Sequence, residues 1–470
     1  MSQSKLSTLP KNKAFLDYLD DKKKLNRTST TEIKYPIGAI PPIVDLPKYE
    51  VTSNKDIMFP DKYDLRSEGR VTSIKDQATL GTCWAFATYG SLESNVLPIE
   101  TTDFSENNLI NNHGFDWTQN KGGNHNMSSA YLTRWSGPIA ESDDPYTGEV
   151  HPSPLNIHPT KHVQEIRLLP QRQNANDNDS IKYALINHGA IFSYMCWNVD
   201  YYNPSSASYY YNIIDANINH AVTIVGWDDN YVSTNFSIIP PGNGAFIIKN
   251  NWGTSWGNGG YFYISYYDKR FEASSVYTIA EEVNNFKDIY QYDLLGFLSG
   301  VGYTGSRNIW MANMFTATSS NPIAAISFYT LFPSTECTIE IYTNCLISPT
   351  SGNLSSVTSF TSGIVGYQTV HLNDLTPITK GTKFSIAVSL TVSEGTTSSI
   401  AIEERIEGFS SSVTINPGES FVSNDKSSWL DLSELSPYGN ICLKAFTTET
   451  NSNTIVSFDP LIKTSSTSLV

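Results

Sequence analysis

Cys83 is the residue of this sequence whose type and setting most directly suggest chemistry. It lies in the stretch QATLGTCWAFATY (77–89), immediately before an apolar run that predicts a helix. A cysteine that begins a helix faces backbone N–H donors and the positive end of the helix dipole, and both favour the nucleophilic thiolate. A lone cysteine is more often a small buried apolar residue, so the interpretation of Cys83 depends on partners elsewhere in the chain.

A thiol peptidase needs a histidine to pair with the thiolate, a group that orients this histidine, and donors for the developing oxyanion. His220, in INHAVTIVGW, precedes a predicted strand that would hold its imidazole at a sheet edge. Asn250, in IIKNNWGTSWGNGGYF, is the candidate orienting amide, and Asn251 is the adjacent alternative. Gln77 and the backbone N–H of Cys83 are the candidate oxyanion donors.

Three blocks resemble the signature blocks of the papain family of cysteine peptidases: KDQATLGTCWAFA, INHAVTIVGW and KNNWGTSWGNGGYFYIS. FPDKYDLRSEGRVTSIKDQ is similar to the start of the mature domain in that family, and the likeness extends over 58–275. The resemblance implies Cys83 as nucleophile, His220 as base, Asn250 as orienting residue and Gln77 as oxyanion donor. It also implies that peptide bonds are hydrolysed through a thioester and that no cofactor is required.

The same resemblance implies where a peptide substrate lies. Two glycines match the segment that pairs with the substrate backbone. Three apolar residues are expected to contribute to a pocket for the second residue on the acyl side, and a tryptophan is expected to cover the histidine–amide hydrogen bond. In the same order, these residues are Gly122 and Gly123, then Met127, Ile218 and Ala221, then Trp252.

The loop before Cys83 departs from the family pattern. Most relatives carry a disulfide there, and its two positions are occupied by Leu80 on one side and by Asn120 and Lys121 on the other. We therefore expect this loop to be held by packing alone. The five cysteines are sparse and odd in number, which does not indicate a disulfide framework, and they lack the C-x-x-C spacing of a structural metal site.

The pattern along the chain predicts an α+β fold: a papain-like catalytic domain of two lobes, one helical and one resembling a β-barrel, followed by an all-β sandwich domain. Segment 1–57 is expected to be a pro-segment, with one short helix in KNKAFLDYLDDKKKLN and then an extended proline-bearing stretch. The peptidase domain is expected over 58–284. Alternating strands such as TIEIYT and KFSIAVSL predict the sandwich over 285–450, and 451–470 is a polar tail.

The pro-segment is too poor in apolar residues to fold alone, so we expect it to lie on the peptidase domain and to keep the enzyme latent. An extended chain can occupy the groove beside Cys83 and hydrogen-bond near Gly122 and Gly123. We expect it to run opposite to the substrate, which would protect it from cleavage. The expected cleavage region is KYEVTSNKD (48–56).

The combination of a short pro-segment, a papain-like domain and a β-rich C-terminal domain resembles a subgroup that includes clostridial surface-layer-processing proteases with a "lectin-like" domain. YQYDLLGFLSGVGY and INPGESFVSNDKSSWLDL carry this likeness. It implies an extracellular or surface setting, protein or peptide substrates, a glycan or cell-surface ligand for the β-domain, and a structural calcium ion in that domain. No spacing identifies ligands for the ion.

Composition excludes several classes of function. A net charge of -15 and the lack of Lys and Arg clusters argue against a nucleic-acid partner. No run approaches the roughly 18 apolar residues of a membrane span. The first residues, MSQSKLSTLPKNKAF, lack the apolar core of a secretory signal, which leaves the export route open. The alternative function is a surface adhesin or glycan-binding protein with a vestigial protease domain, and the complete set of four candidate catalytic residues argues against it.

Overall fold

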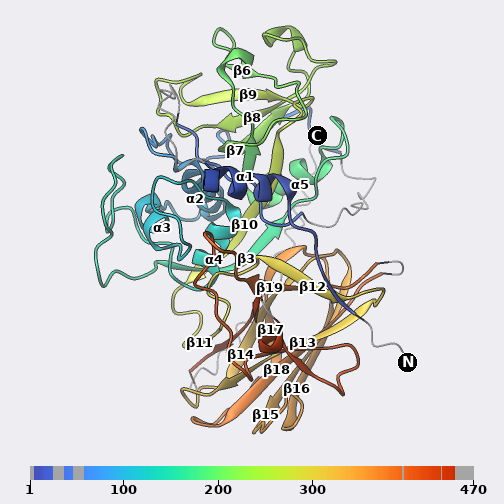
Figure 1. The fold of residues 1–470 in the computed structure, drawn as a ribbon. Helices are drawn as coiled ribbons and strands as arrows, with labels where there is room; N and C mark the ends of the chain where they lie inside the picture. The colour runs from blue at the N-terminus through green and yellow to red at the C-terminus, as the bar shows by residue number, and fades with distance from the viewer. Residues whose placement is uncertain (1–4, 25–35, 46–57, 394–395, 436, 450–470) are drawn as a thin grey trace, which may run out of the picture.

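The protein folds into a part with helices, which holds the predicted catalytic residues and which we call the catalytic part, and a β-rich part beneath it (Figure 1). This computed structural model describes residues 5–24, 36–45, 58–393, 396–435 and 437–449. The predicted cleavage region 48–56 and the polar tail 451–470 lie outside the described residues. Within the described chain, no helix is long and apolar enough to cross a membrane.

A 13-stranded sheet runs through both parts of the molecule. It is open, so the second catalytic lobe is an open sheet where the sequence predicts a β-barrel-like lobe. In spatial order its strands are β11 (Ile289–Tyr290), β23 (Leu443–Thr447), β14 (Ile323–Thr330), β17 (Gly366–Thr376), β3 (Lys161–Leu168), β10 (Glu272–Glu282), β4 (Ile191–Met195), β7 (His220–Asp228), β8 (Ala245–Lys249), β9 (Tyr261–Ser265), β6 (Ser208–Tyr209) and β5 (Tyr202–Asn203), with β2 (Lys62–Asp64) beside β7.

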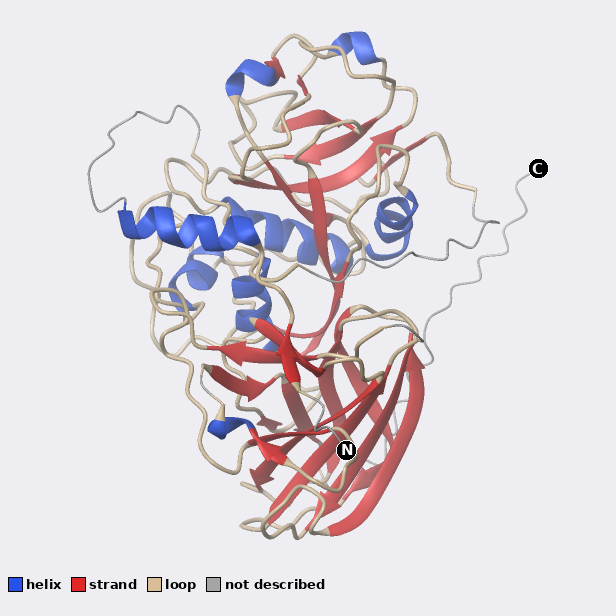
Figure 2. Ribbon diagram, turned by 45° about the vertical axis from the view of Figure 1, so that its right-hand side comes forward, coloured by secondary structure: helices blue, strands red, loops and turns tan. Residues whose placement is uncertain are grey.

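The helices gather on the catalytic part (Figure 2). They are α1 (Lys13–Lys24), α2 (Cys83–Val96), α3 (Glu106–Asn112), α4 (His125–Thr133) and α5 (Asp179–His188). Helix α2 is buried along nearly its whole length and packs on β7, β10 and β4. A Cβ on Gly90 would lie 2.7 Å from Thr223 Oγ1, so this glycine lets α2 approach β7 closely. The side chains of Ser105 and Asn124 cap α3 and α4.

The β-rich part has two further sheets, which form the predicted sandwich with the near end of the large sheet. Their inward-facing apolar side chains build one continuous core. The six-stranded sheet is β16 (Asn353–Ser362), β15 (Thr335–Thr343), β18 (Lys383–Thr391), β13 (Asn308–Thr316), β20 (Ser420–Ser423) and β21 (Leu430–Asp431). The four-stranded sheet is β1 (Leu6–Thr8), β12 (Ser299–Tyr303), β19 (Ile400–Glu404) and β22 (Tyr438–Ile441).

The two parts are joined by backbone hydrogen bonding between β17 and β3. Gly366, Tyr367 and Gln368 pair antiparallel with the 165–167 stretch of β3. The strand ladder therefore continues from the β-rich part into the sheet of the catalytic part, although the sequence changes character near residue 285.

The N-terminal segment lies on both parts. Strand β1 pairs with β12 of the β-rich part, and the predicted helix is present as α1. On α1, Phe15 is fully buried and its ring packs edge-on against Phe409, with ring centroids 5.1 Å apart. Residues 36–45, which we call the arm, then run in extended form into the catalytic part.

Candidate active site

Cys83 is the first residue of α2 and is fully buried. Its sulfur accepts a hydrogen bond from the backbone N–H of Ala221, with an N–S distance of 3.4 Å, and the backbone N–H of Gly38 in the arm also faces it. Burial raises the pKa of the Cys83 thiol to about 12, although these backbone donors favour the thiolate. With the arm in place, Cys83 is therefore an uncharged thiol at neutral pH.

His220 begins β7 and is held from two sides. Its Nε2 lies 2.9 Å from Asn250 Oδ1, and the Trp252 ring stacks on the imidazole at 4.5 Å between centroids and 20° between planes. An amide oxygen can only accept, so Nε2 carries the proton and Nδ1 is the basic nitrogen. Nδ1 is buried and has no hydrogen-bond partner among the described residues. Burial lowers the pKa of His220 to about 4, against a smaller opposing effect of the hydrogen bond to Asn250.

The two adjacent asparagines have different contacts. Asn250 follows β8 and is the one that bonds the imidazole. Asn251 donates from Nδ2 to the carbonyl oxygens of Cys83, at 3.2 Å, and Ala221, at 3.4 Å. It therefore braces α2 against β7 and is not the partner of the histidine.

Gln77 lies next to the site, but its side-chain amide is engaged. Nε2 donates to the carbonyl of Leu80 at 2.6 Å and lies 3.5 Å from the carbonyl of Pro36 in the arm. The side-chain oxygen of Gln77 is buried and has no partner among the described residues. An oxyanion could be bound by this amide only if one of these contacts were exchanged for it.

The loop before Cys83 is held by a hydrogen bond, which corrects the expectation of packing alone. The backbone N–H of Gly81 donates to Asn120 Oδ1 at 2.6 Å, beside the place where relatives have their disulfide. All five cysteines are free thiols. A polar side chain thus links the same two loops without a covalent bond.

The arm occupies the groove that the sequence assigns to the substrate. Ala39 forms a parallel bridge with Gly123. Gly123 N–H donates to Gly38 O at 2.9 Å, Ile40 N–H donates to Gly123 O at 3.0 Å, and Ala39 N–H donates to Asn219 O at 3.0 Å. A Cβ on Gly122 would meet the carbonyl oxygen of Gly38, so this glycine admits the arm backbone.

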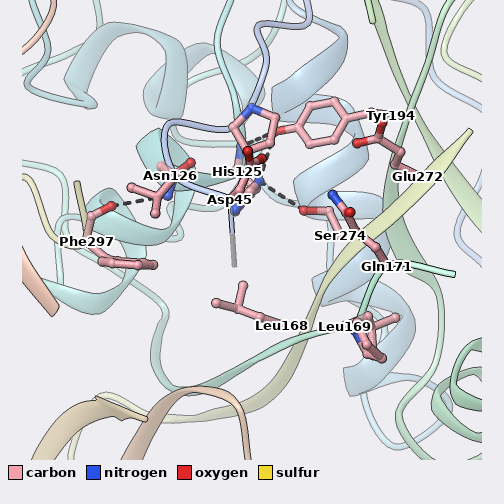
Figure 3. Close-up of a pocket in the computed structure, with 13 residues that line it drawn as sticks. Asp45, His125, Asn126, Leu168, Leu169, Gln171, Tyr194, Glu272, Ser274 and Phe297 are labelled. Atoms are coloured by element: carbon pink, nitrogen blue, oxygen red, sulfur yellow. Dashed lines mark hydrogen bonds between the residues drawn. The ribbon is translucent and has the colours of Figure 1, made fainter. Parts of the chain in front are cut away.

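A cavity of about 60 Å³ lies farther along the arm (Figure 3). Its walls include His125, Tyr194 and Glu272, and Pro42, Val44 and Asp45 of the arm also line it. The three predicted pocket residues Met127, Ile218 and Ala221 are buried in the apolar core under the arm and do not line this cavity. Sequence reasoning missed the lining residues, and the position of His125 two residues after Gly123 is the signal that could have found one of them.

A calcium site would need several oxygen ligands close together. Among the residues that the structure describes, no group of three or more His, Cys, Asp and Glu side chains is placed to hold a metal ion. The side chains of the described β-rich part therefore do not present a carboxylate cluster that fits calcium.

Two family models match the chain. Residues 59–283 match the papain family cysteine protease model, and residues 289–447 match the lectin like domain model. A cysteine protease of Blomia tropicalis is 30% identical over 219 residues, covering 44% of this chain and 61% of that protein. A second relative, from Arabidopsis thaliana, is also 30% identical and is covered over 56% of its length. The chain thus spans about 60% of the length of these curated relatives.

Two solved structures match both parts of the chain together. The cysteine protease and lectin-like domains of Cwp84, a surface layer associated protein of Clostridium difficile, superpose with a TM-score of 0.80 at 25% identity, over 95% of this chain and 98% of that chain. A variant of the clostridial cysteine protease Cwp84 after propeptide cleavage gives a TM-score of 0.73 at 26% identity, over 83% of this chain and 99% of that chain.

Proposed function

We propose that this chain, whose residues 59–283 are a papain family cysteine protease domain and whose residues 289–447 are a lectin-like domain, is a cysteine endopeptidase made in a latent form. The observation that carries the proposal is the arrangement of Cys83, His220 and Asn250 at the junction of α2, β7 and β8. The family match covers residues 59–283, and the proposal extends peptidase activity from that domain to the whole chain.

In the proposed reaction, Cys83 Sγ attacks the carbonyl carbon of a peptide bond. His220 takes the thiol proton at Nδ1, because Asn250 keeps the other ring nitrogen protonated. The imidazolium then protonates the leaving amine, and water hydrolyses the thioester. The backbone N–H of Cys83 and the amide of Gln77 are the proposed oxyanion donors, with Gln77 exchanging its contact to Pro36 for the substrate oxygen.

The direction of the arm supports latency. A bound substrate would place its N-terminal, acyl-side half on Gly123 and its leaving-group half near Trp252. The arm has the opposite polarity, since Pro36 O accepts from Trp252 Nε1 at 3.2 Å and Ile40 lies on Gly123. Its carbonyl groups consequently do not present the scissile geometry, and the arm blocks Cys83 without being cut.

The lectin-like domain contributes to holding the arm. Lys11 Nζ pairs with Glu404 Oε2 at 2.7 Å and donates to Leu298 O at 3.1 Å, both in the lectin-like domain. Next to it, Asn12 N–H donates to the Ile43 carbonyl of the arm at 3.0 Å. The segment that fills the groove is therefore linked to a segment that is anchored on the second domain. Cleavage within 46–57 would still leave these contacts in place.

The setting and ligands of the chain are proposed by likeness. Cwp84 is surface-layer associated, and we extend an extracellular or surface location and protein substrates to this chain. Binding of a glycan or cell-surface ligand rests on the lectin-like family match alone. Calcium binding rests on the resemblance alone, and melting of the full chain with and without a calcium chelator tests it.

An epoxide probe that reacts with active-site thiols tests the enzyme against the adhesin alternative. We expect one covalent adduct, mapped to Cys83, after the chain is cut in 46–57 and the arm is separated. Cys83→Ala is expected to lose both labelling and cleavage of a fluorogenic peptide at an unchanged melting temperature. Full activity of this variant would refute the mechanism, and absence of any labelling or cleavage would favour the adhesin.

A full-length chain, verified uncut by mass spectrometry, and a chain starting at Met58 test latency with the same peptide. We expect the full-length chain to be much less active. Equal rates would contradict a blocking role of the arm.

A further inference from the structure

The cavity beside the arm is placed where an acyl-side substrate residue would project. Glu272 on β10 is paired with Tyr194 on β4, and Tyr194 is paired with Ala221 on β7. Directly paired residues point to the same face of a sheet. Strands are about 4.8 Å apart, so Glu272 stands two spacings, roughly 10 Å, from Ala221, whose N–H bonds the nucleophilic sulfur.

The opposite wall of the cavity begins immediately after the substrate-pairing glycines. His125 opens α4 two residues after Gly123, and its ring nitrogen Nδ1 lies 2.9 Å from Tyr194 Oη and 3.0 Å from Ser274 Oγ. These contacts fix the two walls relative to each other (Figure 3). A residue whose backbone pairs with Gly123 can therefore direct its side chain between α4 and the row that ends at Glu272.

The charge of the cavity is acidic. Of the 13 lining residues, all within the described chain, none is a lysine or an arginine, and the two charged ones are Glu272 and Asp45 of the arm. Burial lowers the pKa of His125 to about 4, so this imidazole is neutral at pH 7. Figure 3 shows the Glu272 carboxylate beside the Tyr194 side chain.

Glu272 is only weakly paired. Its Oε1 lies 3.5 Å from Arg270 Nη1, the single cation within ion-pair distance among the described residues, and its side chain is 28% exposed. The arm brings no cation to it and instead places the second carboxylate, Asp45, on the same cavity. When the arm leaves the groove, Asp45 leaves with it. The Glu272 carboxylate can then accept a substrate cation at a shorter distance than the 3.5 Å to Arg270.

We propose that Glu272 makes this cavity a cation-accepting subsite, so that the activated enzyme selects substrates with lysine or arginine as the second residue on the acyl side of the scissile bond. The inference rests on the proposed function. The cavity has room for more than one water molecule while the arm is seated, since about 10–15 Å³ is the minimum for one, and it loses the walls formed by Pro42 and Val44 when the arm departs. A lysine stem would lie along the Tyr194 ring with its ammonium group at Glu272.

The test uses the full-length chain after cleavage in 46–57 and removal of the arm, with active sites titrated by the epoxide probe. Three fluorogenic peptides differ only in the second acyl-side residue, which is Lys, Leu or Glu, and a second series varies the third residue. We expect kcat/KM for the Lys peptide to exceed that for the Leu peptide by about 10–100-fold, the range for one hydrogen-bonded charge pair. This preference should fall as salt is raised.

Glu272→Gln is expected to reduce the Lys-to-Leu ratio about 10-fold or more, and Glu272→Lys is expected to favour the Glu peptide. Glu336→Gln, at an exposed position of β15 in the lectin-like domain, removes the same charge and should keep the wild-type ratio. A wild-type enzyme that cleaves Lys and Leu peptides equally, or a ratio unchanged by Glu272→Gln, overturns the subsite. If the wild type cleaves no peptide at all, the proposed function itself fails.

Discussion

Gly38 is the position where one added methyl group should abolish the proposed latency. A Cβ on Gly38 would lie within 2.6 Å of Gly81 Cα and closer still to its carbonyl group, far inside the contact distance of carbon atoms. The obstacle is backbone on both sides, so the arm must move away. We therefore predict that Gly38→Ala vacates the groove over Cys83 without any cleavage.

The size of the effect follows from the backbone hydrogen bonds that seat the arm. Three of them join Gly38, Ala39 and Ile40 to Gly123 and Asn219. At about 1 kcal/mol each, their loss weakens seating by about 3 kcal/mol, which is roughly 100-fold in the ratio of seated to vacated arm. Vacating the groove also returns the thiol from a pKa of about 12 toward its ordinary value, which increases the reactive thiolate.

The assay is the rate at which iodoacetamide modifies Cys83 at pH 7 in the full-length chain, followed by intact mass and peptide mapping. Gly38→Ala should react about 100-fold faster than wild type. Gly363→Ala is the matched control, because a Cβ there meets nothing within 4 Å, and it should react at the wild-type rate. A Gly38→Ala rate within about threefold of wild type, with intact mass showing uncut protein, would refute the seating of Gly38 over the nucleophile.

Gln77→Ala should lower kcat of the activated enzyme by about 10²–10³ with little change in KM, the scale for one lost oxyanion donor; an unchanged kcat would remove Gln77 from the oxyanion site. With the arm seated, burial lowers the pKa of His220 to about 4, and vacating the groove is expected to return it toward 6.5, so between pH 6.5 and 4 the vacated state binds more protons and acid favours it. From pH 7 to 5 we expect vacating to increase by roughly tens of fold, measured as a fall in the protection factor of the Ala39 amide after division by the intrinsic exchange rate at each pH; a pH-independent protection factor would contradict the linkage. Phe15→Ala removes a fully buried ring, a change that typically lowers the free energy of unfolding by about 3–5 kcal/mol, and it should speed Cys83 modification in the uncut chain. An unchanged rate would show that anchoring on the lectin-like domain does not contribute to the proposed latency. Asn120→Ala should lower the free energy of unfolding by about 1–2 kcal/mol, and dithiothreitol should leave the melting temperature of the wild type unchanged; a drop would reveal a paired thiol.

The proposed catalytic residues could be selected from the sequence because each lies in a short block that also predicts a helix or a strand. Cys83 begins an apolar helix, His220 begins an apolar strand, and Asn250 ends another. The choice between Asn250 and Asn251 could not be made from the sequence. It depends on how β8 ends relative to β7, and only the observed contacts separate the two amides.

Other features depend on contacts between residues far apart in the chain. The hydrogen bond between Gly81 and Asn120 joins the two loops that a disulfide joins in most relatives, and no local sequence pattern predicts it. The row from Ala221 to Glu272 arises from the register of three strands that the sequence order separates. The proline-rich arm was predicted to be extended, but its hydrogen-bond register on Gly123 follows from the shape of the groove.

The pairing of β17 with β3 has a consequence for how such an enzyme can reach a substrate. Only β3, β10 and β4 stand between the lectin-like strand β17 and β7, which carries His220, and every step is a backbone ladder. No flexible linker interrupts this path, because all five strands are hydrogen-bonded neighbours in one sheet. If the lectin-like domain is fixed to a support, the groove is held at one height and one angle above it. A protease attached in this way would cleave only those peptide bonds that reach its groove at that distance from the support. Its substrate selectivity would then depend on the orientation of the substrate as well as on its amino-acid sequence.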